Sequence, residues 1–312
     1  MKKFHPYLSL LLFVLFASSC ANYKINYSEK SKNWEQNSPP TSKVLEHRMY
    51  LIGDAGNAPM GGTTAVLQFL SSQLPKESKN SSIVFLGDNI YPGGMPPKGE
   101  EEDRTLSEYR LKIQMDALEG FKGKTHFIPG NHDWRTWGLK GLKREEKFIE
   151  KYMNRGVEDK DDWENYFLPD NGCAGPDVVE LNENLVMVII DSQWWLADWD
   201  KEPSINDGCE VKNKFMFQFN VENILRKHRR KNVVVALHHP PFSNGPHGGA
   251  TTLKEHIFPL TQLKDNLYIP LPVIGSIGAF ARGALGSKQD NAHQTYKAVS
   301  YTHLTLPTIC SV

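Results

Sequence analysis

Hydrophobic and polar positions along this chain form a repeating pattern of short apolar runs, each followed two residues later by an Asp, Asn or His. The runs are Met49–Ile52, Ile83–Leu86, His126–Pro129 and Val233–Ala236. Short runs rich in β-branched and aromatic residues that end near a turn residue are typical of buried β-strands. The pattern therefore predicts four strands with polar groups at their carboxyl ends.

Longer segments between these runs predict helices at residues 63–74, 106–118, 142–153 and 215–229, and a further strand at Leu185–Asp191. We expect the acidic run Glu100–Asp103 to begin a helix, where the helix dipole favours negative charge. Strands that alternate with helices are typical of a layered α/β domain. The chain contains 39% hydrophobic residues, which is enough for a large core.

The strand ends carry oxygen and nitrogen groups that suit a pair of metal ions. Open α/β sheets place their ligands at the carboxyl ends of the strands, and carboxylate, amide and imidazole groups are metal ligands. The groups belong to four motifs, Gly53-Asp54-Ala55-Gly56, Gly87-Asp88-Asn89-Ile90-Tyr91, Gly130-Asn131-His132-Asp133 and Val235-Ala236-Leu237-His238. A lone Gly-Asp pair would mean little, because many tight turns contain one.

These four motifs, in this order, resemble those of the calcineurin-like metallophosphoesterases. Tyr91, three positions after Asp88, makes the chain most similar to the purple acid phosphatases of the tartrate-resistant type. His247 follows His238 at the offset where those enzymes carry an active-site histidine. The resemblance covers roughly residues 48–249 and implies an α/β fold, a sandwich of two mixed β-sheets flanked by helices.

The resemblance also implies a ligand set for two metal ions. Asp54, Asp88 and Tyr91 would bind the first metal, expected to be Fe(III), because a hard cation prefers anionic oxygens. Asp88 would bridge to the second metal, a divalent Fe, Zn or Mn ion that Asn131 and His238 would also bind. A bridging carboxylate holds two cations close enough to clamp both oxygens of a phosphoryl displacement.

His132 and His247 fall outside this ligand set, and we expect them to face the substrate. His132 would donate to a phosphate oxygen with Asp133 as its orienting partner, and His247 would protonate the leaving alkoxide. The alternatives are a turn histidine for His132 and a surface histidine in a Gly/Pro loop for His247.

The expected function is hydrolysis of small phosphate monoesters. Two alternatives remain open: a phosphodiesterase or nucleotidase on the same scaffold, and a surface lipoprotein that binds a phosphorylated ligand without turnover. The 36 basic and 36 acidic residues cancel. No overall positive field therefore favours a nucleic-acid partner.

The N-terminus predicts export. Residues 1–20 combine Lys2-Lys3, an apolar run and a small-residue segment that ends at Cys20, which resembles a bacterial lipoprotein signal. Cys20 would then carry the lipid that anchors the protein to a bacterial membrane, in the periplasm or at the cell surface. The alternative is an ordinary cleaved signal that happens to contain a cysteine. Residues 21–44 predict a flexible tether, because their composition can bury little apolar surface.

The end of the sequence departs from the family pattern. The Gly-His-x-His motif that supplies two further ligands in the metallophosphoesterases has no match after His247, where the remaining histidines are His256, His293 and His303. We therefore expect residues 45–299 to form one metallophosphoesterase domain that is incomplete at its C-terminus, and residues 300–312 to be a non-native tail.

Two smaller questions stay open at this stage. Cys173 and Cys209 lie in Gly-, Asp- and Pro-rich loops, and in an exported protein they either form a disulfide or remain two separate thiols. Trp194, Trp195 and Trp199 either line a substrate pocket or pack in the core.

Overall fold

The structure is a computed structural model that describes residues 45–197, 208–241, 251–264 and 266–285. The chain divides into two compact units, one built on residues 45–241 and the other including residues 242–294. The predicted signal peptide, tether, lipidated Cys20 and C-terminal tail lie outside the described residues, so these predictions and the domain bounds stay predictions.

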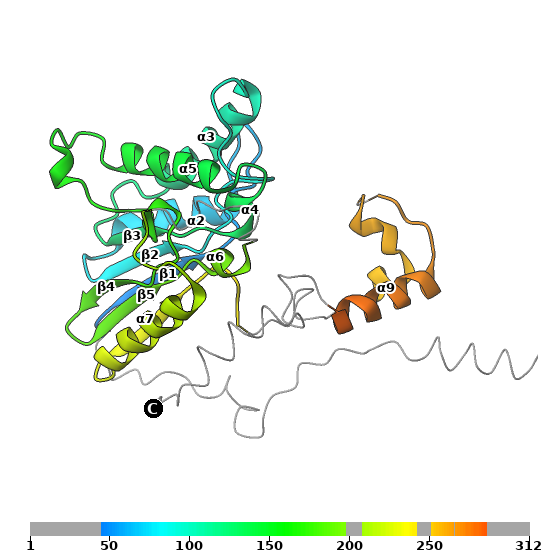
Figure 1. Ribbon diagram of the computed structural model, residues 1–312. Coiled ribbons are helices and arrows are strands. Elements are labelled where there is room, and N and C mark those ends of the chain that lie inside the picture. Colours follow the sequence, from blue (N-terminus) through cyan, green and yellow to red (C-terminus); the bar gives the residue numbers. More distant parts are fainter. Residues whose placement is uncertain (1–44, 198–207, 242–250, 265, 286–312) are drawn as a thin grey trace, which may run out of the picture. The chain divides into compact units, whose positions relative to one another are not determined.

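The larger unit contains two small β-sheets (Figure 1). In sheet A, the strands β1 (Arg48–Ile52), β2 (Ser81–Phe85) and β3 (Lys124–Phe127) run parallel in that order. In sheet B, β5 (Leu185–Ile189) pairs antiparallel with β4 (Asp177–Asn182) and parallel with β6 (Asn232–Ala236). The predicted α/β class with two sheets flanked by helices is confirmed. Of the two sheets as described, only sheet B is mixed.

Helices connect and flank the strands. Parallel neighbours need a long crossover, and α2 and α3 supply it within sheet A. The helical elements of this unit are α2 (Ala65–Gln73), η3 (Leu74–Lys76), α3 (Glu101–Asp116), α4 (Asn131–Trp134), α5 (Gly138–Met153), η4 (Lys160–Asp162), η5 (Asp170–Gly172), α6 (Ser192–Leu196) and α7 (Lys214–Lys227).

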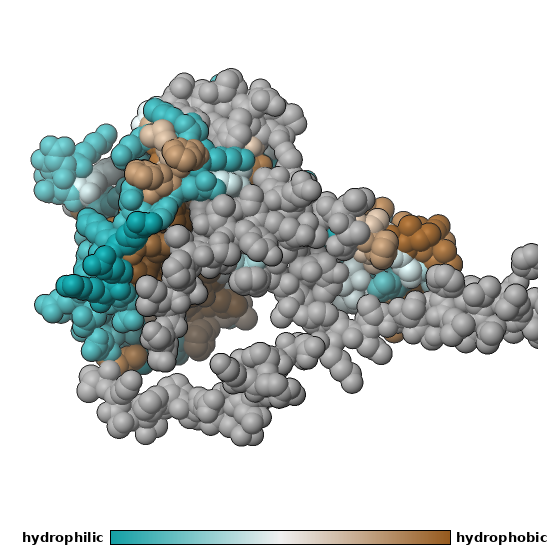
Figure 2. Space-filling view, turned by 60° about the horizontal axis from the view of Figure 1, so that its bottom comes forward, coloured by the Kyte–Doolittle hydropathy of each residue, from teal (hydrophilic) through white to brown (hydrophobic). Residues whose placement is uncertain are grey.

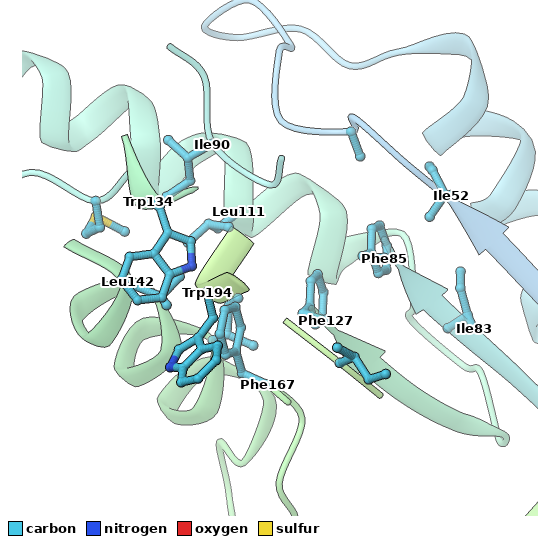
Figure 3. Packing of buried hydrophobic residues seen from close by; sticks show 14 of the residues in the cluster. Ile52, Ile83, Phe85, Ile90, Leu111, Phe127, Trp134, Leu142, Phe167 and Trp194 are labelled. Atoms are coloured by element: carbon cyan, nitrogen blue, oxygen red, sulfur yellow. The ribbon is translucent and has the colours of Figure 1, made fainter. Parts of the chain in front are cut away.

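Strand β2 shows how the layers pack, because its side chains alternate between two apolar clusters. Val84 joins Met187 and Ile189 of sheet B in one cluster, so the two sheets face each other there. Ile83 and Phe85 point the other way and belong to the main core, which also contains residues from α2, α3 and α5. Figure 3 shows Phe85 beside Phe127 of β3, and their rings stack with 4.4 Å between centroids.

Most of the predicted elements are confirmed, with shifted ends. The acidic run begins a helix as expected, since Glu101, Glu102 and Asp103 occupy the first turn of α3. Helix α5 begins at Gly138, four residues before its predicted start. Strand β4 was not predicted, because its sequence DVVELN is short and half polar.

The two open questions on tryptophans and cysteines have structural answers. Trp194 and Trp195 are buried in the main core, with Phe217 of α7 beside both rings. Trp199 lies outside the described residues. Cys173 and Cys209 form a disulfide that spans 36 positions of sequence.

The described part of the second unit consists of α8 (Leu253–Ile257), η7 (Pro259–Gln262) and α9 (Pro272–Leu285). Four apolar side chains on α9, Val273, Ile274, Ile277 and Phe280, are exposed, and Figure 2 shows hydrophobic surface on this unit. None of the helices in the described part of the chain is long and apolar enough to span a membrane.

Candidate metal centre

The loops after β1 and β2 bring the first two candidate ligands together. Asp54 and Asp88 both have a φ of 57°, the left-handed conformation in which Asp is one of the tolerated residues. The loops are held side by side by backbone hydrogen bonds, from Asp54 N to Gly87 O at 3.1 Å and from Gly56 N to Asp88 O at 3.0 Å. The backbone therefore fixes both carboxylates at the carboxyl edge of sheet A.

Two glycines allow the third loop to approach as closely as it does. Gly87 has a φ of 90°, and a Cβ there would lie 2.6 Å from Gly130 N and 2.9 Å from His238 Nδ1. A Cβ on Gly130 would lie 2.4 Å from Asp88 Oδ1. All three distances are steric clashes, so any larger residue at either position would push the candidate ligands apart.

Tyr91 lies between the two carboxylates. Its hydroxyl is 2.7 Å from Asp54 Oδ1 and 2.8 Å from Asp88 Oδ2. Burial raises the pKa of the Tyr91 phenol above its ordinary value, and the two acidic partners raise it further. A nearby cation would instead lower the pKa of the phenol and of the carboxylates, because it favours their anionic forms.

His238, at the end of β6, faces the other oxygen of Asp88. Its Nδ1 is 2.8 Å from Leu86 O, which can only accept, so Nδ1 carries a proton. In the neutral ring, Nε2 is then an acceptor, yet it lies 2.9 Å from Asn131 Oδ1 and 3.5 Å from Asp88 Oδ1. Acceptors this close repel one another unless a proton or a cation compensates.

Asp88 thus presents one carboxylate oxygen to Tyr91 and the other to His238. Oδ2 faces Tyr91, and Oδ1 faces His238 while accepting from the backbone N–H of His132 at 2.8 Å. Asp88 is buried, with 2% of its surface exposed. Within the described residues no three His, Cys, Asp or Glu side chains group as metal ligands. The convergence found here depends on Tyr91 and Asn131 as well.

The structure corrects one predicted contact. Asp133 was expected to orient the His132 ring, but its carboxylate accepts from the backbone N–H groups of Gly130, Asp88 and Ile90 at 2.7, 2.9 and 3.0 Å. The His132 ring is instead fixed by Pro92 O, 2.8 Å from Nδ1, and by the Tyr91 ring at 4.2 Å between centroids. Asp133 therefore shapes the loops, and Pro92 and Tyr91 orient His132.

The next two histidines after His238 in the sequence are His239 and His247, and the structure describes the first of them. The rings of His238 and His239 make an edge-on contact, with 4.8 Å between centroids and 82° between their planes, and His239 Nδ1 lies 2.8 Å from Ser192 Oγ. His247 lies outside the described residues, so its proposed role stays a prediction.

The comparison with protein families assigns the class. The calcineurin-like phosphoesterase model matches residues 47–268, so the chain belongs to the calcineurin-like phosphoesterase family. Members of this family hydrolyse phosphoric esters and generally bind two divalent metal ions. No curated protein matches the chain.

The donor set fits such a pair of ions. Around Tyr91 three oxygens converge, two of them from carboxylates, which suits a hard cation. Around His238, an imidazole nitrogen faces an amide oxygen, which suits a divalent ion. Asp88 contributes an oxygen to both groups.

Sequence reasoning missed the residues that support these loops from behind. Arg110 of α3 donates to Ala58 O at 2.8 Å and to Tyr91 O at 2.6 Å. Gln114, one turn later, donates to Asn89 O. The available signal was the presence of polar residues on the buried face of a predicted helix, since Arg110 and Gln114 are flanked there by Leu111 and Met115.

Proposed function

We propose that this protein hydrolyses small phosphate monoesters at a dinuclear centre of the purple acid phosphatase type. The observation that carries the proposal is the Tyr91 hydroxyl between Asp54 and Asp88. A phenolate ligand beside two carboxylates favours Fe(III). Asn131, His238 and the second oxygen of Asp88 would bind a divalent Fe, Zn or Mn ion.

The bound ions would supply an activated water and neutralise charge on the phosphate. Asp88 orients both groups of ligands, because its oxygens face Tyr91 on one side and His238 on the other. The proton on His132 Nδ1 is held by Pro92 O, which leaves Nε2 to take a second proton and donate to a phosphate oxygen. His247 would protonate the leaving alkoxide.

The test is spectroscopic and catalytic. We expect the full chain loaded with iron to show a visible phenolate-to-iron absorption band, which Tyr91→Phe should remove. Tyr50→Phe is the matched control, since the Tyr50 hydroxyl donates to Glu77 at 2.7 Å and to none of the candidate ligands, and it should leave the band unchanged. No band in the iron-loaded wild type, or an unchanged band in Tyr91→Phe, would contradict the purple-phosphatase assignment.

Substrate turnover separates the alternatives. We expect the metal-loaded protein to hydrolyse p-nitrophenyl phosphate faster than bis(p-nitrophenyl) phosphate. The reverse preference would favour a phosphodiesterase or nucleotidase. Tight metal binding with no turnover of either ester would favour a protein that binds a phosphorylated ligand without hydrolysing it.

We also propose export and lipid anchoring through Cys20, on the evidence of the sequence alone. Expression with a labelled fatty acid tests this. The wild type should incorporate label and Cys20→Ser should not, whereas equal labelling of both would contradict it.

A further inference from the structure

A layer of buried polar side chains lies behind the candidate metal centre, and its middle member is Asn89. Asn89 follows Asp88 directly, and its side chain is fully buried. The two N–H groups of Asn89 Nδ2 serve three acceptors, Ile128 O at 3.0 Å, Glu145 Oε1 at 3.2 Å and Asp133 Oδ2 at 3.3 Å, so one of them is shared. One amide thus connects the backbone before Gly130, the loop-shaping Asp133 and helix α5.

Asp133 transmits this contact to the metal-binding loops. The Asp133 carboxylate accepts from Asp88 N, Ile90 N and Gly130 N. Those backbone groups flank the two candidate ligands Asp88 and Asn131. A shift of Asn89 would therefore remove a hydrogen bond to Asp133. Asp133 would then hold the loops of Asp88 and Asn131 at a different spacing.

Glu145 is the member of this layer on helix α5, and the proposed reaction does not require its carboxyl group. It lies on the buried face of α5 with Leu142 and Ile149, and none of its surface is exposed. Its Oε2, like Asn89 Oδ1, has no hydrogen-bond partner among the described residues. An uncompensated carboxylate at such a position would be strongly destabilising.

A proton on Glu145 resolves this difficulty. Burial raises the pKa of Glu145 well above its ordinary value, and repulsion from Asp133 raises it further. The acid has one O–H donor where the carboxylate has none, so protonation removes the buried negative charge while Oε1 still accepts from Asn89 Nδ2.

We propose that Glu145 is a positioning residue of the metal centre, which as a neutral acid holds Asn89 and thereby the loops that carry Asp88 and Asn131. The link to metal binding rests on the function proposed above. The hold on the loops stands on the contacts alone, and the two parts are tested separately.

Glu146 provides the matched control. It is the next residue on α5, but its carboxylate accepts from Asn171 N, at 3.0 and 2.9 Å, in the η5 region instead of touching the metal-binding loops. Four variants of the full chain are compared with the wild type: Glu145→Leu, Glu145→Asp, Glu145→Gln and Glu146→Leu. Glu145→Asp withdraws the carboxyl by one methylene and serves if the leucine variant fails to fold.

Hydrogen exchange without added metal measures the hold on the loops. We expect Glu145→Leu and Glu145→Asp to speed exchange about tenfold in peptides that cover residues 86–91 and 129–133. Glu145→Gln should stay near the wild type, because glutamine both donates and accepts as the neutral acid does. Glu146→Leu should speed exchange at residues 170–172 only. Unchanged loops in Glu145→Asp, or loops as fast in Glu145→Gln as in Glu145→Asp, would overturn the proposal.

Calorimetric titration with Zn²⁺ measures the link to the metals. Groups that orient ligands typically contribute about 10–100-fold in metal affinity, and we expect a loss of that size in Glu145→Asp and near-wild-type affinity in Glu145→Gln and Glu146→Leu. Faster loops with unchanged affinity would overturn the link to the metals. A wild type that binds no Zn²⁺ would contradict the proposed function, while the exchange result would still decide the hold on the loops.

Discussion

Sheets A and B contribute unequally to the candidate site. All three described strands of sheet A end at a loop that carries candidate ligands, namely Asp54 after β1, Asp88 and Tyr91 after β2, and Asn131 after β3. In sheet B only β6 leads to one, His238. Parallel neighbours all present their carboxyl ends at one edge, whereas antiparallel β4 presents its beginning there. The uniform direction of sheet A thus brings its three ligand loops to one edge.

Sheet B also supports the loop that carries Asn131, through Asp191 at the end of β5. Asp191 follows β5 and is fully buried, accepting from Trp134 Nε1 at 2.8 Å and from Trp194 N at 3.0 Å. Trp134 is the last residue of α4, which begins with Asn131. Sheet B therefore braces the loop that sheet A presents.

The largest effect is expected at Asp88, the ligand from sheet A that faces His238 from sheet B. Asp88→Asn should lose both metal ions and reduce phosphate-monoester turnover by at least about 10²-fold, the cost of misplacing reacting groups by roughly 1 Å. Asp54→Asn should weaken only the ion on the Tyr91 side, because the Asp54 carboxylate meets the site at the Tyr91 hydroxyl. Metal content per chain and turnover test this, and equal loss of both ions in both variants would contradict the division.

The sequence predicted the strands and ligands of sheet A better than the buried polar contacts that hold the ligand loops in place. Apolar runs followed by Asp or Asn locate the strands and their ligands, because both signals are local. The roles of Asp133, Glu145 and Asp191 depend on contacts across 43 to 57 positions of sequence. Short patterns carry no information about such contacts, which is why Asp133 was paired with its neighbour His132.

Removal of the disulfide near sheet B should have the next largest effect, on stability. The disulfide joins Cys173, before β4, to Cys209, before α7, and closes a loop of 36 positions. In the chain-entropy description, a closed loop of this size contributes about 2–4 kcal/mol to stability. The double variant Cys173→Ser/Cys209→Ser should lose that amount in urea unfolding and keep its metal affinity. Equal unfolding midpoints, or a metal affinity that falls with stability, would contradict a role confined to sheet B.

Asp191 offers a pH-dependent test of the brace. Burial raises the pKa of Asp191 from 3.8 to about 7, against the opposing effect of its hydrogen bonds. Between these values the folded protein binds more protons than the unfolded chain, so this group contributes less stability as pH rises from about 4 to about 7. Asp191→Asn lacks the titration. The free energy of unfolding of the variant should therefore rise relative to the wild type over this range, by about 1.4 kcal/mol for each pH unit.

The control for Asp191 is an exposed carboxyl, Glu183→Gln, in the turn between β4 and β5. It shows how the free energy of unfolding responds when an exposed carboxyl is removed instead of a buried one. Urea unfolding at intervals between pH 4 and pH 8 measures both differences. A constant difference for Asp191→Asn would mean that Asp191 stays ionised in the folded protein.

The smallest effects are expected from one ion pair beside each sheet. Glu180 of β4 pairs with Lys231 before β6, and the Glu180 side chain is 55% exposed. Glu77, after η3, pairs with Arg48 of β1 at 2.5 Å, is only 13% exposed and also accepts from Tyr50. Exposed pairs typically contribute little to stability because water and salt screen them, so Glu180→Ala should change the free energy of unfolding very little. Glu77→Ala should cost more, because it leaves the Tyr50 hydroxyl without this partner. Urea unfolding at low and high salt measures both variants, and a larger cost for Glu180→Ala would show that sheet B depends on its surface charges more than sheet A does.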